Sequence, residues 1–227
     1  MASPTKRTVE LFYDVISPYT WIAFESLCRH RNVWNIDLKL KPFLLGGVMQ
    51  GSDNKPPGMV PNKGMYMARD LKRLALHYQL PIKMPANPVE AMFIKGSLSP
   101  MRFLTAIDLE QPNLVENTSR SLWTRIWSMD QDITEPASLL EAAKAAGMTK
   151  EMAQHFLGQL KSQKVKDRLK QYTEEGLDHG AFGSPTILVE DANKKKQMVF
   201  GSDRMHIIAD ILGEKYEGPQ NQLAAKL

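Results

Sequence analysis

The sequence has a single cysteine, Cys28, among 227 residues. One cysteine excludes an internal disulfide framework and is typical of a protein kept in a reducing compartment. Cys28 follows the apolar register of an expected helix, so we interpret it as a buried structural thiol and not as a nucleophile. Thiol chemistry by the chain's own residues is therefore not predicted.

Charge of one sign and long apolar runs are also lacking. The 29 basic and 25 acidic residues give a net charge of +4, which is too small and too scattered to predict a nucleic-acid surface. No apolar run is long enough to span a membrane. The opening residues MASPTKRT lack the apolar core of a signal peptide, so we expect no secretion.

Two ligand patterns are missing as well. The glycine-bearing loops match neither the Walker nor the dinucleotide pattern, so no nucleotide is predicted. The five histidines show no spacing typical of metal ligands, so no metal is predicted either.

The first forty residues carry the pattern of a βαβ unit. Apolar and polar residues alternate over residues 8–14 and again over 36–42, which predicts two strands. Between them, Ser17 has the chemistry of a helix N-cap and Pro18 suits the first helical position, so we expect a helix over 18–31. Strands joined in this way are parallel and form a right-handed unit.

The middle of the chain is expected to be helical. Residues 46–64 are rich in glycine and proline and predict a long functional loop. Prolines and glycines then separate a series of apolar helical patterns, in which Trp123 and Trp127 form a stripe facing the core. The expected helices cover residues 65–79, 97–110, 112–130, 135–146, 149–162 and 164–178.

The chain then returns to strands. Residues 184–190 and 197–200 predict a β-hairpin, and a last helix follows with Ser202 or Asp203 as its N-cap. The order βαβ, helices, ββα predicts an α/β fold of the thioredoxin-like kind. Residues 1–63 and 180–227 form the thioredoxin-like domain in this interpretation, and residues 64–179 form an all-helical insertion domain.

Three polar junctions fall at related places in this fold. Ser17 lies between the first strand and its helix, Ser184 and Pro185 open the third strand, and Ser202 and Asp203 precede the last helix. Helix starts favour anions, and a free strand edge can pair with a peptide backbone. The junctions thus predict a site for an extended, anionic, peptide-like ligand, and that geometry requires Pro185 to be cis.

Six stretches, in order along the chain, resemble the kappa class of glutathione transferases. They are ELFYDVISPYTW, DNKPPGMVPNKGMYMARDLKR, GSLSPMRFLTA, DITEPASLL, GAFGSPT and FGSDRMH. The resemblance spans nearly the whole chain and implies a DsbA-like thioredoxin fold with a helical insertion. That family is similar to the disulfide-oxidising DsbA proteins and to glutathione-dependent 2-hydroxychromene-2-carboxylate isomerases.

The resemblance also implies a role for each junction. Ser17 stands where the DsbA relatives carry the reactive cysteine of their Cys-x-x-Cys motif, and its hydroxyl is expected to donate to the thiol of bound glutathione. Pro18 and Tyr19 are expected to line the thiol end, and the backbone of Ser184 before Pro185 is expected to pair with the cysteinyl portion. The family often has an apolar residue at the position of Ser184.

The remaining implied contacts lie at the two ends of glutathione. Asn54 and Lys63 are expected at the glycine carboxylate, and Ser202 and Asp203 at the γ-glutamyl end. Arg204 is expected to act in the neighbouring subunit's site, because the family is dimeric.

Each of these residues also has a structural interpretation. Ser17 and Asp203 can be simple caps, Asn54 and Lys63 ordinary loop residues, and Pro185 a trans residue at a strand edge.

The function implied is the conjugation of glutathione to small electrophiles in detoxification, with reduction of hydroperoxides as a related activity. Two alternatives remain at this point: a glutathione-dependent isomerase, and a non-catalytic protein-binding or assembly factor. The family implies the mitochondrial matrix or the peroxisome, and the terminal Ala225-Lys226-Leu227 is close to the peroxisomal Ser-Lys-Leu signal.

Overall fold

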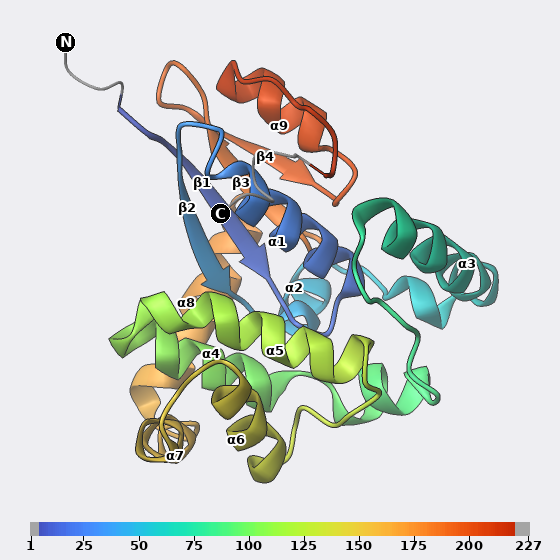
Figure 1. The fold of residues 1–227 in the computed structure, drawn as a ribbon, viewed down its shortest axis with the longest axis vertical. Coiled ribbons are helices and arrows are strands. Elements are labelled where there is room, and N and C mark those ends of the chain that lie inside the picture. The colour runs from blue at the N-terminus through green and yellow to red at the C-terminus, as the bar shows by residue number, and fades with distance from the viewer. Residues whose placement is uncertain (1–4, 221–227) are drawn as a thin grey trace.

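The computed structural model describes residues 5–220, and the terminal Ala225-Lys226-Leu227 lies outside them. A four-stranded mixed sheet in the order β2-β1-β3-β4 stands at the centre (Figure 1). β1 pairs with β2 in parallel and with β3 antiparallel, and β3 and β4 form the expected hairpin. The strands are β1 (Arg7–Tyr13), β2 (Ile36–Pro42), β3 (Thr186–Glu190) and β4 (Lys196–Phe200).

Each face of the sheet packs on its own apolar cluster, because neighbouring residues of a strand point to opposite faces. Leu11 and Tyr13 of β1 join α1 (Pro18–His30) and α9 (Met205–Leu212) in the larger cluster. Phe12 joins the smaller cluster with Tyr172 of α8 (Gln163–Asp178). The strand pairing and the helices packed on both faces of the sheet confirm the thioredoxin-like βαβ and ββα halves.

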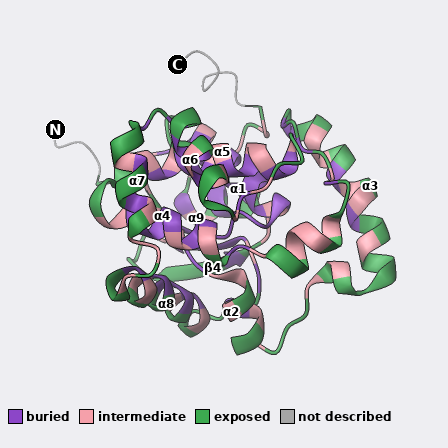
Figure 2. Cartoon of the chain, turned by 90° about the horizontal axis from the view of Figure 1, so that it is seen from below, coloured by how far each residue is buried: buried purple, intermediate pink, exposed green. Residues whose placement is uncertain are grey.

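The middle of the chain supplies the other helices, which gather beside and below the sheet in Figure 1. Their inward faces are buried (purple in Figure 2), and the larger apolar cluster continues through them and through α1. The helices are α3 (Pro61–Tyr78), α4 (Leu98–Glu110), α5 (Val115–Trp127), α6 (Pro136–Ala145) and α7 (Lys150–Gly158). Short helical turns are η1 (Pro57–Met59), η2 (Glu90–Lys95) and η3 (Pro112–Leu114). No helix within residues 5–220 is long and apolar enough to cross a membrane.

The prediction of a long loop over residues 46–64 is wrong. Helix α2 (Leu45–Gly51) occupies its first part, η1 follows, and α3 already begins at Pro61. The glycines that predict a loop serve packing instead. A Cβ built at Gly51 would lie 2.6 Å from Cδ1 of Leu177 on α8, so any side chain there would force Leu177 to move.

Candidate active site

Ser17 caps α1 as predicted. Its Oγ accepts a hydrogen bond from the backbone N of Thr20 at 3.2 Å, and its own backbone N donates to the carbonyl of Asp14 at 3.1 Å. Pro18 fills the first helical position, where no N–H is needed. Ser17 is only 7% exposed, so the hydroxyl lies at a buried junction between strand and helix.

The second junction lies directly against the first. The Ser184–Pro185 bond is cis, as the ligand geometry requires. Oγ of Ser17 donates to the carbonyl oxygen of Ser184 at 3.3 Å, and the hydroxyls of Thr20 and Ser184 are 2.7 Å apart. The two groups expected to hold the ligand, the Ser17 hydroxyl and the Ser184 backbone, are thus in direct contact.

The loop before α9 lies next to this pair but differs from its prediction. Backbone N of Gly201 donates to the carbonyl of Pro185 at 3.2 Å, which ties the loop to the cis-proline segment. Neither Ser202 nor Asp203 caps α9: the N-cap is Arg204, and no side chain bonds to the first turn. Gly201 has a φ of +100°, so the chain turns there, and the Asp203 carboxylate pairs with Arg204 instead of reaching a helix N–H.

Ser202 is nevertheless held in place. The residue is buried at 5% exposure, and its carbonyl accepts a hydrogen bond from the hydroxyl of Tyr78, at the end of α3, at 3.5 Å. Asp203 is the opposite case, with 69% of its side chain exposed.

Asn54 and Lys63 contact different parts of the site. Nδ2 of Asn54 donates to the carbonyl of Phe182 at 2.6 Å and so links the chain after α2 to the segment before Pro185. Lys63, on the first turn of α3, lines a pocket of about 370 Å³ together with Tyr19. Pro57, Asn62, Tyr66 and Met67 complete the lining.

Tyr19 is fixed at the edge of that pocket. Its hydroxyl donates to Oδ2 of Asp70 at 3.0 Å, while the hydroxyl of Tyr66 donates to Oδ1 at 3.3 Å. Partial burial and the adjacent Asp70 carboxylate raise the pKa of Tyr19 well above its ordinary value. Tyr19 therefore remains a neutral phenol at physiological pH and does not supply a base.

Asp14 is a part of the site that sequence reasoning missed. Its buried carboxylate accepts hydrogen bonds from the backbone N of Ile16 at 3.0 Å, the backbone N of Leu45 at 2.9 Å and Oγ of Ser97 at 2.7 Å. Burial raises the pKa of Asp14 to about 6, and these three bonds act in the opposite direction. One side chain thereby joins the Ser17 turn to α2 and α4. The only signal in the sequence is a carboxylate at the end of a strand.

The geometry favours an anion at the opening of α1. Helix N-termini carry a partial positive charge, and α1 has no acidic residue in its first turn to cancel it. The chain's own thiol does not serve there, since Cys28 is buried on α1 and burial raises its pKa well above the ordinary value. Within residues 5–220, no three His, Cys, Asp or Glu side chains gather as a metal site would require.

Comparison with known proteins decides the family. Residues 8–213 match the family model described as a DSBA-like thioredoxin domain. The chain is 54% identical over 216 residues to glutathione S-transferase kappa 1 of Homo sapiens, covering 95% of each protein. The chain belongs to the kappa class of glutathione S-transferases. A further member, glutathione S-transferase kappa 2 of Caenorhabditis elegans, is 33% identical, with 96% of this chain and 97% of that protein covered.

Among solved structures, the kappa-class chain has the fold of a 2-hydroxychromene-2-carboxylate isomerase, with a TM-score of 0.71. Identity to that protein is 18%, and the match covers 91% of this chain and 94% of the isomerase. At this identity the likeness shows the fold alone. The DsbA-like architecture with its helical insertion is thereby confirmed for this kappa-class chain, whereas the domain limits at residues 63 and 180 stay predictions.

Proposed function

We propose that this glutathione transferase binds glutathione with its thiol at Ser17, stabilises the thiolate and transfers it to small electrophiles. The proposal rests above all on one observation: a buried serine hydroxyl caps a helix N-terminus directly opposite the cis peptide bond at Pro185. The membership in the kappa class supports glutathione as the substrate.

The chemistry follows from the thiol's acidity. A free thiol has a pKa of about 8.5 and is mostly protonated at neutral pH. A helix N-terminus and a hydroxyl donor both favour the thiolate, and comparable sites lower a thiol pKa to roughly 3.5–7.5. In this proposal the Ser17 hydroxyl turns from the Ser184 carbonyl toward the sulfur and keeps its own proton.

Transfer is then a simple displacement or addition. The sulfur electron pair forms a bond to an electrophilic carbon, and a leaving group such as halide departs with the electron pair of its bond. With a hydroperoxide, the thiolate attacks the outer peroxide oxygen and becomes a sulfenic acid as the O–O bond breaks, and the departing alkoxide takes a proton from water to become an alcohol. A second glutathione thiol reduces the sulfenic acid to water and glutathione disulfide.

The remaining contacts follow the shape of the ligand. We place the glycine carboxylate near Lys63 and Asn54, the cysteinyl backbone along Ser184, and the γ-glutamyl ammonium at Asp203. This placement is supported by the contact between Ser17 and Ser184 and by the pocket beside Lys63. Ser202 binds at the γ-glutamyl end of glutathione. The backbone N–H groups of the first turn of α9 bind the γ-glutamyl carboxylate.

We further propose a homodimer in which Arg204 reaches the partner's site, and residence in the mitochondrial matrix or the peroxisome. Half of the Arg204 side chain is exposed, and its guanidinium pairs with the exposed Asp203 of the same chain. Analytical ultracentrifugation measures whether the protein is a dimer. The kinetics of a mixed dimer carrying Arg204→Ala in one subunit test whether Arg204 contributes to the partner's site. A fluorescent fusion imaged with and without residues 225–227 tests the compartment.

The deciding experiment compares Ser17→Ala with Ser162→Ala. Both serines cap helices, because Oγ of Ser162 accepts from the backbone N of Val165 at 3.4 Å on α8, far along the chain. Each loss of a cap costs about 1 kcal/mol of stability. Only Ser17→Ala should raise the pKa of the bound thiol, followed by thiolate absorbance, and reduce kcat/KM at neutral pH by about 10- to 100-fold. An unchanged pKa and turnover in Ser17→Ala would refute the role.

Isomerisation is the second candidate. A 2-hydroxychromene-2-carboxylate isomerase of Sphingobium xenophagum is 22% identical over 215 residues, and the solved isomerase shares the fold. An isomerase of the glutathione-dependent type would add the same thiolate and release it again. Counting glutathione consumed per turnover separates the two, since transfer uses one molecule each time and isomerisation uses none.

A further inference from the structure

Two tryptophans of α5 bond to the backbone of the Ser17 turn. Nε1 of Trp123 donates to the carbonyl of Ser17 at 3.2 Å, and Nε1 of Trp127 donates to the carbonyl of Val15 at 3.3 Å. Both indoles are fully buried. Their position on α5 matches the predicted core-facing stripe, but the stripe also holds two carbonyl groups that lead into the proposed active site.

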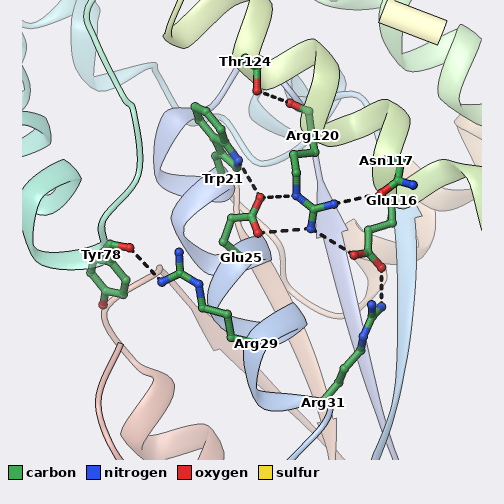
Figure 3. A network of polar contacts seen from close by, with 9 residues as sticks. All are labelled: Trp21, Glu25, Arg29, Arg31, Tyr78, Glu116, Asn117, Arg120 and Thr124. Carbon is green, nitrogen blue, oxygen red and sulfur yellow. Dashed lines mark hydrogen bonds and ion pairs between the residues drawn. The ribbon is translucent and has the colours of Figure 1, made fainter. Parts of the chain in front are cut away.

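The same face of α5 also contacts the middle of α1. Trp123 and Trp127 continue the spacing of Glu116 and Arg120, so the four side chains lie on one side of the helix. Arg120 binds the carboxylate of Glu25 on α1 with Nε at 2.7 Å and a terminal nitrogen at 3.2 Å (Figure 3). Thus α5 holds α1 both in its middle and at its first turn.

Trp21 connects these two contacts. Its Nε1 donates to Oε1 of Glu25 at 3.1 Å, as Figure 3 shows. Its ring lies parallel to that of Trp123, with 6.4 Å between the centroids and 2° between the planes. The rings of Tyr13 and Phe24 also pack on Trp123, at 5.6 and 4.8 Å. The indole at the Ser17 carbonyl therefore has little freedom to move.

Resting on the proposed function, we propose that Trp123 and Trp127 are positioning residues for the bound glutathione thiolate. By donating to the carbonyls of Ser17 and Val15, they hold the opening of α1 and with it the Ser17 hydroxyl. The carbonyl of Ser17 also accepts a hydrogen bond from the backbone N of Trp21 at 3.3 Å, so removing the indole takes away one of its two partners. The turn before α1 then has less support, and the hydroxyl can shift away from the sulfur. Donors held in advance cost no reorganisation during the reaction.

The test replaces each indole by a ring without a donor. Trp123→Phe keeps an aromatic ring against Trp21 and Phe24 but removes the N–H. We expect the pKa of the bound thiol to rise and kcat/KM at neutral pH to fall by about three- to tenfold, with recovery at high pH where the thiol ionises anyway. Trp127→Phe should show a smaller shift in the same direction, because its partner Val15 lies two residues before Ser17.

Trp34→Phe is the matched control. Trp34 is 3% exposed, and its Nε1 also donates to a backbone carbonyl, that of Lys215 at 3.0 Å, away from the turn. The variant loses the same kind of hydrogen bond and should lose similar stability in urea. Its thiol pKa and its pH profile should equal those of the wild type.

Other titrating groups near the turn must be separated from the thiol. Asp14 titrates near pH 6, whereas the pKa values of Tyr19 and Cys28 are raised well above their ordinary values. Glu25 and Glu116 lie further along α1 and α5, and both are paired with Arg120. Thiolate absorbance is therefore read as the difference between protein with glutathione and protein with S-methylglutathione, which has no thiol proton.

The outcomes are distinct. A raised thiol pKa in Trp123→Phe, absent in Trp34→Phe, supports the inference. If the thiol pKa in both α5 variants equals that of the wild type while Ser17→Ala raises it, the positioning role is wrong and the proposed function stands. If the wild-type thiol keeps its ordinary pKa when bound, the proposed function itself fails. Should Trp123→Phe not fold, Trp127→Phe carries the same test at Val15.

Discussion

The thiol end and the γ-glutamyl end of the proposed site are built in different ways. At the thiol end, Ser17 is buried, and Asp14 and Trp123 bond to the backbone on either side of it. At the γ-glutamyl end, Asp203 is mostly exposed, and its ion pair is with the adjacent Arg204. The charged groups of the first end are fixed by long-range contacts, whereas the Asp203 carboxylate at the second end is exposed and paired only with its neighbour in the chain.

This difference separates two tasks. Groups that stabilise a thiolate act best when they are held in place before the ligand arrives, which requires support from several helices. Groups that only bind a charged end of the ligand can remain exposed, because an ion pair in water contributes little to stability and exchanges partners readily. Substitutions at the thiol end should thus change stability and reactivity together, and those at the γ-glutamyl end should change affinity alone.

The largest effect is expected from removing the Asp14 side chain. Asp14→Ala leaves the backbone N–H groups of Ile16 and Leu45 and the hydroxyl of Ser97 without their partner. We expect a loss of about 3–5 kcal/mol in the free energy of unfolding. Asp203→Ala removes the same side chain at the exposed end and should stay within about 0.5 kcal/mol. Urea unfolding followed by tryptophan fluorescence compares the two, and equal losses would remove the contrast.

The second effect is a pH dependence of stability. The folded pKa of Asp14, about 6, lies above the value of an unfolded aspartate, so the folded protein binds more protons between about pH 4 and 6. This contribution to stability is complete below about pH 4 and is lost as the pH rises through 6. The loss is on the order of 2–3 kcal/mol. Asp14→Asn cannot titrate, and a constant stability difference between it and the wild type across this range would contradict the prediction.

A smaller effect is expected at the exposed end. Asp203→Asn removes the charge that we place opposite the γ-glutamyl ammonium, and KM for glutathione should rise by about three- to tenfold. Turnover at saturating glutathione and the pKa of the bound thiol should not change, because the sulfur lies at the other end. A shifted thiol pKa in this variant would show that the two ends are not independent.

The smallest effect concerns Ser184. Its hydroxyl is 2.7 Å from that of the buried Thr20, which accounts for a serine at this position. Ser184→Ala should cost about 1 kcal/mol of stability, and the double variant with Thr20→Val should recover part of it. Glutathione affinity, measured by calorimetry, should hardly change if Ser184 binds through its backbone; a large loss would assign the contact to the side chain.

Local sequence signals predict the features that depend on neighbouring residues. The cap at Ser17 and Pro18, the hairpin and the order of the elements all follow from spacing within a few residues. Glycine misled the prediction around Gly51, since its role there is contact with a helix more than a hundred residues away. The turn at Gly201 likewise moved Ser202 and Asp203 off the helix cap.

The parts of the site that could not be predicted are held by contacts between distant residues. Ser17 and Trp123 are 106 positions apart, and Asp14 and Ser97 are 83 apart. An aromatic stripe at helical spacing predicts that the rings are buried. It does not predict whether an indole N–H donates to a particular carbonyl. Only the packing of α5 against α1 shows which carbonyl each indole meets.

The central claim is that glutathione supplies the sulfur and the opening of α1 receives it. A crystal structure of the protein with bound glutathione measures this directly. The account predicts the thiol sulfur within hydrogen-bonding distance of Oγ of Ser17, with the cysteinyl backbone along Ser184. A tripeptide bound with its sulfur away from the first turn of α1 would contradict it.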